Sequence, residues 1–287
     1  MSVPSVVIAG CGDVGSRLAS QLLASEWEVH GLRRDISRLP DGVIGIAGDL
    51  FKKDCPDTWP IGGVDYLVYC AAATDHDEAG YRAAYVQGLQ HVLEWLEDYG
   101  QTPKHLLFVS SSSVYGQQNG EWVDETSETQ AKGYSGQVML EAEQVALNSG
   151  IPASVVRLTG IYGPGREWLL TQVRQGYRVA IDPPLYGNRI HADDAGGLLA
   201  FLLKADMQGK ALDECYIGVD DAPVPLAELV DWLRERLGIT EWSDEASVRR
   251  AGSKRCSNAR AKALGWEPRY SSYREGYAAI LGESKHP

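Results

Sequence analysis

Short apolar runs alternate with longer amphipathic stretches along residues 1–160. Continuous apolar runs predict buried strands, whereas apolar residues spaced three and four apart predict helices. The expected strands cover residues 6–9, 27–32, 43–47, 64–71, 106–109 and 154–158, and the expected helices cover residues 13–24, 81–99 and 135–149. This alternation is typical of an α/β protein with a doubly wound parallel sheet covered by helices on both faces. We therefore predict a Rossmann-type sheet that binds its ligands at the carboxyl ends of the strands.

The alternation becomes irregular after residue 160. Gly163-Pro164-Gly165 and Asp182-Pro183-Pro184 interrupt the chain, and residues 193–204 predict a helix that packs back on the sheet. From about residue 207 the pattern predicts amphipathic helices and little strand. We predict a dinucleotide-binding Rossmann domain over residues 1–160, with 188–205 packed on it. Residues 161–187 and 206–287 are expected to form a small, mostly helical substrate-binding lobe.

The turn after the first expected strand carries the pattern GxGxxG, at Gly10, Gly12 and Gly15. It follows an apolar strand and opens a helix, which is the context in which this pattern binds the pyrophosphate of a dinucleotide. The glycines allow a tight turn, close approach of the phosphates, and packing of the helix on the strand. The residues expected to contact the cofactor here are Gly10, Cys11, Gly12, Asp13, Val14 and Gly15.

The end of the second expected strand selects between NAD and NADP. NAD sites place a carboxylate there for the ribose 2′-hydroxyl, but this strand ends with Arg33 and Arg34. Arginine pairs with the 2′-phosphate of NADP through charge-assisted hydrogen bonds of about 1.5–3 kcal/mol each. Asp35, two residues beyond the strand end, is the competing candidate and would select NAD. We expect NADP, with NAD as the alternative.

The ends of the next strands supply further expected cofactor contacts. Asp49 and Leu50 follow the third strand, where Asp49 is positioned for the adenine side. The small side chains of Ala71, Ala72 and Ala73 end the fourth strand and leave room for the cofactor, although core packing also accounts for them. Ser110, at the end of the fifth strand, completes the expected cofactor contacts.

Charge and cysteine content narrow the range of partners. The formal net charge is −12, and an acidic protein repels nucleic acid and anionic membrane surfaces. No apolar run approaches 18 residues and the start of the chain has no basic region, so we expect a cytoplasmic protein without a membrane span. The five cysteines are widely spaced without a CxxC pair, which argues against a disulfide framework and a zinc site.

Several motifs resemble those of the extended short-chain dehydrogenases/reductases, the NAD-dependent epimerases and dehydratases that act mostly on nucleotide sugars. Beside the glycine pattern, they are Gly48-Asp49-Leu50, residues 86–93, Ser110-Ser111-Ser112-Ser113-Val114-Tyr115-Gly116, Arg157, Tyr162-Gly163-Pro164-Gly165, residues 189–194, and Leu264-Gly265-Trp266 with Pro268. The resemblance covers nearly the whole chain. GxGxxG itself departs from the GxxGxxG of typical extended members.

The resemblance implies a catalytic serine or threonine, a tyrosine, and a lysine four residues after the tyrosine. Ser111 matches the serine position. If Tyr134 is the tyrosine, the lysine position holds Val138. If the downstream glutamates set the register, the tyrosine position is Ser135 and the lysine position is Met139. Neither register supplies a lysine, so the chain resembles an atypical branch of the family.

Two further departures concern the family's proton relay and its dehydratase chemistry. Tyr85 stands where the family commonly has a relay asparagine. Ser112 and Ser113 stand where its dehydratases carry an Asp-Glu pair. We therefore do not expect this protein to catalyse the 4,6-dehydration of a hexose.

The family's substrate-binding segment contains several arginines in this acidic chain. We expect Arg166 and Arg189, together with Ser112, to bind an anionic substrate, although surface salt bridges also account for the arginines. The family also implies a homodimer through the helices expected at 81–99 and 135–149.

Two functions are consistent with these residues. The first is an NADP-dependent oxidoreductase or epimerase-like enzyme acting on a hydroxylated, nucleotide-linked sugar, with Ser111 holding the substrate oxygen and Tyr134 exchanging the proton. The second is an NADP-binding sensor that has lost catalysis, which the absent lysine favours.

Overall fold

The computed structural model describes residues 3–243 and 253–282. Its internal contacts divide the chain into two units. Unit 1 comprises residues 1–114, 131–158 and 195–216, and unit 2 comprises residues 115–130, 159–194 and 217–287. None of the helices within the described ranges is long and apolar enough to cross a membrane.

Within the described residues, seven strands form one sheet in the order β11-β7-β5-β4-β1-β2-β3. They are β1 (Ser5–Ala9), β2 (Glu28–Arg33), β3 (Ile44–Ala47), β4 (Tyr66–Tyr69), β5 (His105–Ser111), β7 (Ala153–Leu158) and β11 (Cys215–Gly218). The pairings from β3 through to β7 are all parallel. The predicted doubly wound sheet is confirmed. The order reverses between β1 and β4, which is the point where such sheets bind their ligands.

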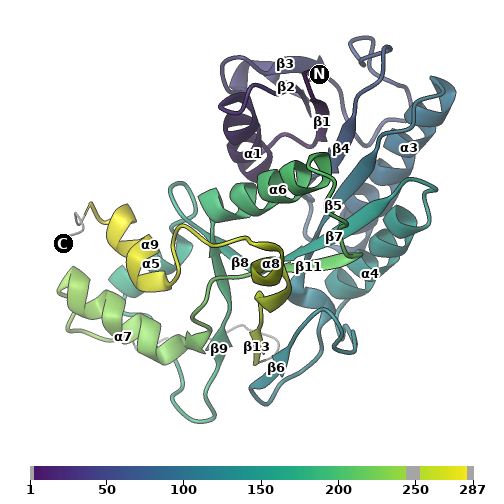
Figure 1. Ribbon diagram of the computed structural model, residues 1–287. Coiled ribbons are helices and arrows are strands. Elements are labelled where there is room, and N and C mark those ends of the chain that lie inside the picture. Colours follow the sequence, from purple (N-terminus) through teal and green to yellow (C-terminus); the bar gives the residue numbers. More distant parts are fainter. Residues whose placement is uncertain (1–2, 244–252, 283–287) are drawn as a thin grey trace. The chain divides into compact units, whose positions relative to one another are not determined.

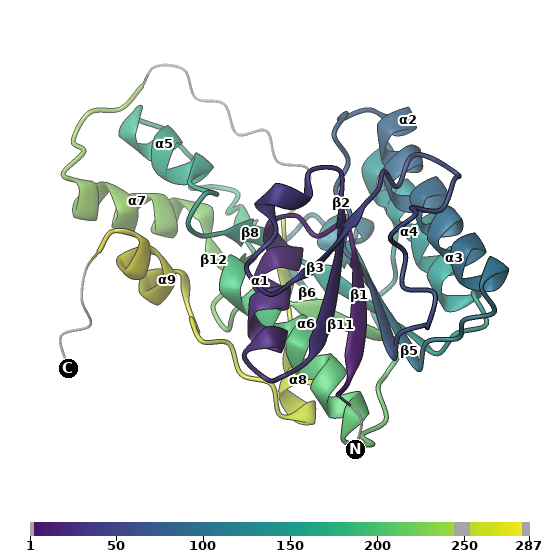
Figure 2. The ribbon, with the colours of Figure 1, turned by 90° about the horizontal axis from the view of Figure 1, so that it is seen from above.

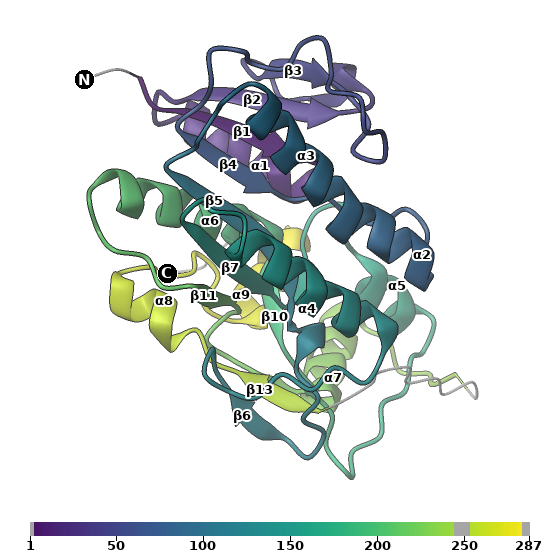
Figure 3. The same cartoon turned by 90° about the vertical axis from the view of Figure 1, so that its right-hand side faces the viewer.

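Helices cover both faces of the sheet (Figures 1 and 2). They are α1 (Asp13–Leu23) and α6 (Ala192–Met207) on one face, and α2 (Glu78–Tyr81), the π-helical segment η2 (Arg82–Gln87), α3 (Gly88–Asp98) and α4 (Tyr134–Leu147) on the other. Figure 3 shows α3 and α4 running side by side over the sheet. Close packing of α6 on α1 requires a glycine, because a Cβ on Gly196 would lie 2.9 Å from the backbone nitrogen of Leu18.

Unit 2 is built mainly from helices and short strand pairs. The helices are α5 (Trp168–Arg174), α7 (Leu226–Leu237), α8 (Ala259–Leu264) and α9 (Tyr273–Ile280), and the short strands are β6 (Glu121–Val123), β8 (Gly160–Tyr162), β9 (Tyr186–Gly187), β10 (Arg189–His191), β12 (Val224–Pro225) and β13 (Lys254–Cys256). Leu170, Leu229 and Leu233 belong to its buried core, where α5 and α7 meet. Two short 3-10 helices, η1 (Ile36–Arg38) and η3 (Ser112–Val114), lie in unit 1.

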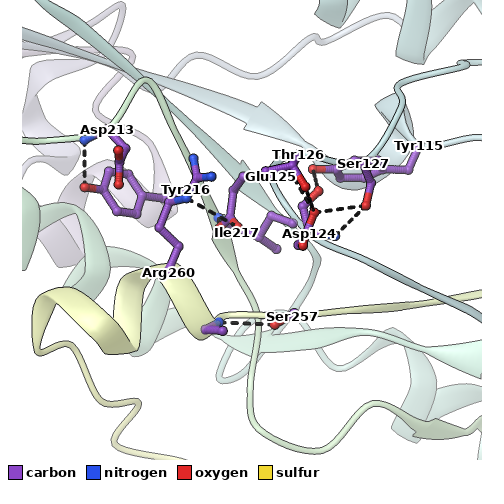
Figure 4. A network of polar contacts seen from close by, with 11 residues as sticks. Tyr115, Asp124, Glu125, Thr126, Ser127, Asp213, Tyr216, Ile217, Ser257 and Arg260 are labelled. Carbon is purple, nitrogen blue, oxygen red and sulfur yellow. Dashed lines mark hydrogen bonds and ion pairs between the residues drawn. The ribbon is translucent and has the colours of Figure 1, made fainter.

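Residues 115–130, assigned to the Rossmann domain from the sequence, group with unit 2. Strand β6 pairs with β13, which lies far along the chain. The side chain of Glu125 accepts a hydrogen bond from the backbone of Ile217 at 2.9 Å (Figure 4). Asp124 closes its own turn by accepting from the backbone and hydroxyl of Thr126. The pairing of β6 with β13 and the contact of Glu125 with Ile217 join segments that are remote in sequence, so periodicity alone gives no sign of them.

The sequence predicts little strand after residue 207, and the short strand β11 is one that it did not locate. Tyr216 and Ile217 are fully buried at the edge of the sheet. The strand is only four residues long. An apolar run of that length does not separate a strand from a helix or loop by its period.

Candidate cofactor and proton-transfer site

The glycine turn after β1 has a backbone that only glycine suits at its first position. Gly10 adopts φ +87°, and a Cβ there would lie 2.6 Å from the backbone of Ala71. Gly15 lies against the turn, because a Cβ there would be 3.1 Å from the carbonyl oxygen of Gly10 and from Ile8. The turn therefore holds the start of α1 tightly against β1 and the end of β4.

The second glycine of the turn lies at an open surface. A Cβ on Gly12 would meet only the carbonyl oxygen of Gly10, at 3.9 Å. Gly12 is also the N-cap of α1 and makes no side-chain capping hydrogen bond. An uncapped helix N-terminus below open space fits an anionic phosphate, because its N–H groups and the helix dipole both favour negative charge. The residues present therefore fit the pyrophosphate of a dinucleotide.

The side chains of this turn are less available for contact with a cofactor than its backbone is. Cys11 is fully buried, and burial raises the pKa of its thiol. Val14 is also buried. Asp13 forms an ion pair with Arg17 at 2.9 Å, one helical turn away. Any contact of these residues with a cofactor is expected through the backbone.

The end of β2 carries arginines and a carboxylate that is already engaged. Asp35 caps η1 by accepting from the backbone and the hydroxyl of Ser37, at 3.2 and 2.6 Å. The hydroxyl of Ser37 is the largest cause that lowers the pKa of Asp35. Arg34 is exposed, and the guanidinium of Arg33 donates to the carbonyl of Arg38 at 3.1 Å. Arg38 is a third arginine at this position, which the sequence analysis did not select.

The remaining predicted cofactor residues occupy the ends of β3 and β4. Asp49 accepts from the backbone of Phe51 at 3.1 Å, and Leu50 is nearly buried. Ala71 packs against the glycine turn, Ala72 is exposed, and Ala73 donates its backbone N–H to the hydroxyl of Tyr85 at 3.4 Å.

A buried ion pair lies behind the end of β5. The carboxylate of Glu143 in α4 accepts from Arg157 at 2.9 and 2.7 Å. Ser110 donates its hydroxyl to the same carboxylate at 2.6 Å. The hydroxyl proton of Ser110 is therefore used in a buried hydrogen bond.

Ser111, the last residue of β5, is half-buried. Its hydroxyl oxygen accepts the backbone N–H of Ser113 at 3.2 Å. Ser112 and Ser113 begin η3, which follows directly.

Burial along α4 does not separate the two registers left open by the sequence, because Val138 and Met139 are 1% and 3% exposed. Ser135, Met139 and Glu143 are four residues apart and share one face of the helix. Met139 is 3% exposed and Glu143 is 2% exposed, so this face is directed inward. In this register the lysine position is filled by a buried thioether that carries no charge.

Tyr134 begins α4 and is 37% exposed. Its hydroxyl donates a short hydrogen bond to the carbonyl of His76. Its ring meets the ring of Tyr81 edge-on, with centroids 5.4 Å apart. Tyr81 also packs on Tyr85, at 5.2 Å between centroids. In the sequence, the only sign of a role for Tyr85 is an aromatic hydroxyl where the family commonly has an asparagine.

The two arginines expected to bind substrate lie in unit 2. Arg166 is exposed and donates its backbone N–H to Gly163 at 2.9 Å. Arg189 is 4% exposed, and one nitrogen of its guanidinium has no hydrogen-bond partner among the described residues. Asp220, also buried, has one such carboxylate oxygen, and burial raises its pKa to about 7. The part of the chain that is described contains no cluster of three or more His, Cys, Asp or Glu placed to hold a metal ion.

The parallel sheet, its switch point and the open glycine turn define the class as a Rossmann-fold protein. The chain belongs to the NAD dependent epimerase/dehydratase family, whose sequence model matches residues 6–210. No curated protein matches the chain.

Solved structures agree with this membership. A protein of Methylobacillus flagellatus, proposed to be an NAD-dependent epimerase/dehydratase, is 36% identical with a TM-score of 0.81, covering 98% of both chains. A conserved protein of unknown function from Silicibacter pomeroyi DSS is 25% identical with a TM-score of 0.74, covering 99% of this chain and all of the other. UDP-glucose 4-epimerase of Thermus thermophilus, solved with NAD, is 19% identical with a TM-score of 0.79 over 98% of both chains, which shows the common fold.

Proposed function

We propose that this protein is an NADP-dependent oxidoreductase or epimerase-like enzyme acting on a hydroxylated, nucleotide-linked sugar. The observation that carries the proposal is an open glycine turn at the switch point of the sheet, with the hydroxyl of Ser111 at the end of a nearby strand. A dinucleotide site and a hydroxyl able to hold a substrate oxygen are two of the parts that such a reaction needs.

The cofactor preference rests on the end of β2. Asp35 uses its carboxylate to cap η1, so it is poorly placed to receive a ribose 2′-hydroxyl as well. The guanidinium groups of Arg33 and Arg34 match the charge of a 2′-phosphate. When bound, the nicotinamide supplies a hydride donor or acceptor. The chain's own residues bind the pyrophosphate at Gly12 and hold the substrate oxygen at Ser111.

The proton-exchanging group has two candidates in unit 1. Tyr134 is the one that the sequence predicts, and its hydroxyl must first leave the carbonyl of His76. Tyr85 is the other, and its hydroxyl accepts a backbone N–H at the carboxyl end of β4.

A second function, an NADP-binding sensor without catalysis, is favoured by the absence of a lysine in either register. Val138 and Met139 are both buried, and neither has a charge with which to lower the pKa of a tyrosine. A sensor would keep the glycine turn and the arginines of β2 but transfer no hydride.

Deuteride transfer separates the enzyme from the sensor. NADPH carrying deuterium on one face of its nicotinamide is incubated with the protein and UDP-4-keto-6-deoxyglucose, and the sugar is analysed by mass spectrometry. The enzyme function predicts stereospecific incorporation of deuterium, reduced about 100-fold or more in Ser111→Ala. Tight binding of NADPH without incorporation would support the sensor and contradict the enzyme.

A further inference from the structure

We infer that Tyr85, rather than Tyr134, transfers the proton, and that its hydroxyl acts together with that of Ser111 on one substrate oxygen. This inference rests on the proposed function, because it assigns a residue to that same site. It is carried by the hydrogen bonds that the hydroxyl groups of unit 1 already make, by the strand ends near which these hydroxyls lie, and by the packing of the tyrosine ring.

Each hydroxyl has one proton to donate, and the hydroxyls of Ser110 and Tyr134 are already used in this way. Tyr134 donates to the carbonyl of His76, and Ser110 donates to Glu143. Tyr85 and Ser111 differ, because each accepts a backbone N–H instead. Within residues 3–243 and 253–282, neither of these two hydroxyls donates its proton to another group.

The two hydroxyls lie at the ends of neighbouring strands. In the parallel pairing of β4 with β5, Tyr69 lies opposite Phe108. Ala73, which donates to Tyr85, is four residues beyond Tyr69, and Ser111 is three residues beyond Phe108. Paired strands are about 4.8 Å apart, so both hydroxyls belong to the same edge of the sheet.

This edge adjoins the proposed cofactor site. Gly10 packs directly on the backbone of Ala71, two residues before Ala73. The hydroxyl of Tyr85 therefore lies along the strand end that borders the glycine turn, where a bound dinucleotide and the substrate would meet.

The position of the Tyr85 ring is fixed by local structure. Tyr85 lies in the π-helical segment η2, and π-helical turns occur frequently at functional sites. The segment inserts one extra residue into the turn, which redirects the side chains that follow. The ring of Tyr81 packs on that of Tyr85 at 5.2 Å and so restrains it. A donor that is restrained before substrate binds loses little entropy in the reaction.

The chemistry suits reduction of a carbonyl. A bound nicotinamide would supply a hydride to the substrate carbon, and the carbonyl oxygen would then gain negative charge. Tyr85 Oη transfers its proton to that oxygen to give the alcohol, and the phenolate that remains regains a proton from water. The backbone N–H of Ala73 stabilises the phenolate, and Ser111 donates to the substrate oxygen throughout.

The absence of a lysine is consistent with this role. Burial raises the pKa of Tyr85, and the nearby Tyr81 and Cys70 add to the effect, while the N–H of Ala73 opposes it. The hydroxyl therefore stays protonated at neutral pH. A proton donor needs this state, whereas a lysine is needed to generate a phenolate base.

Activity measurements distinguish the two tyrosines. With NADPH and UDP-4-keto-6-deoxyglucose, Tyr85→Phe should lower kcat about 100-fold or more while the Kd for NADPH stays within about twofold. Tyr134→Phe and the control Tyr99→Phe, at an exposed position at the end of α3, should keep kcat within about threefold. Loss of activity in Tyr134→Phe with full activity in Tyr85→Phe would overturn the inference. Thermal unfolding of each variant reports whether the fold is retained.

A spectroscopic measurement tests the inference without turnover. Tyrosines are labelled with carbon-13 at Cζ, and the signals of Tyr85 and Tyr134 are assigned from the two phenylalanine variants. Saturating NADP⁺ should shift the signal of Tyr85 and leave that of Tyr134 in place. Binding of NADP⁺ without any shift at Tyr85 overturns the inference but leaves the proposed cofactor site intact. Failure to bind NADP⁺ overturns the proposed function itself.

Discussion

At the residue scale, the buried pair of Glu143 and Arg157 connects α4 to β7. Glu143 to alanine leaves the guanidinium of Arg157 buried without its carboxylate, which destabilises a protein by about 3–5 kcal/mol. We expect a loss of that size in the free energy of unfolding, measured by urea denaturation. The matched control is Glu141→Ala, because Glu141 pairs with Arg82 at the surface and such pairs contribute about 0–1 kcal/mol. Equal losses in both variants would contradict the role given to the buried pair.

Asp220 predicts a dependence of stability on pH. Burial is the largest cause that raises its folded pKa, to about 7, from a usual value near 4. Between those values the folded state holds a proton that the unfolded state has lost, so this residue makes stability fall as pH rises from about 4 to 7. Asp220→Asn should therefore gain stability relative to wild type at pH 8 compared with pH 5.

Urea denaturation at the two pH values measures this difference. Asp231→Asn, at an exposed position in α7, is the control and should give the same difference from wild type at both. A constant difference for Asp220→Asn would contradict the assignment of a buried, protonated carboxyl.

At the scale of elements, the packing of α6 on α1 depends on which glycine faces the partner helix. A Cβ on Gly196 would meet the backbone of Leu18 and Arg17 at 2.9 and 3.1 Å, whereas one on Gly197 would meet only the flexible side chain of Gln21, at 3.4 Å. Gly196→Val should therefore destabilise the protein by about 1–3 kcal/mol through overpacking.

Gly197→Ala serves as the matched control within the same helix. It should be neutral or stabilising by up to about 1 kcal/mol, because alanine favours the helix. Thermal unfolding reports both variants. A destabilisation by Gly197→Ala as large as that by Gly196→Val would show that the contact with α1 is not the cause.

Hydrophobic periodicity predicted the helices that cover the sheet well where the amphipathic stretches were long. The helix expected at 13–24 is observed as Asp13–Leu23, and the one at 135–149 as Tyr134–Leu147. The helix expected at 81–99 begins earlier, at Glu78, and contains the π-helical segment, because apolar spacing does not record one inserted residue.

The site shows the same division between what local pattern can and cannot reveal. The glycine turn could be predicted because its three glycines lie close together in the sequence, and the backbone conformation of Gly10 and the close packing of Gly15 both require glycine. The carboxylate of Asp35 caps η1 and is therefore poorly placed to bind a ribose. This cap depends on a side-chain hydrogen bond from Ser37 that residue spacing alone does not specify. The hydrogen bonds that separate Tyr85 from Tyr134 join segments distant in sequence and so required the structure.

At the scale of the whole molecule, an acidic chain places three arginines, at 33, 34 and 38, around one strand end. A net charge of −12 repels an anionic ligand at long range, so a local cationic site is needed to bind one. The homodimer expected through the helices at 81–99 and 135–149 stays a prediction, and sedimentation velocity on the intact protein would test it.

Binding of the cofactor is the central claim, and calorimetric titration with NADPH and NADH measures it directly. Wild type should bind NADPH more tightly than NADH. Arg33→Ala should weaken NADPH binding about 10- to 100-fold and leave NADH binding nearly unchanged, whereas the control Arg174→Ala, an exposed arginine of α5, should change neither. Equal affinity for both cofactors would contradict the assignment of NADP, and binding of neither would contradict the dinucleotide site itself.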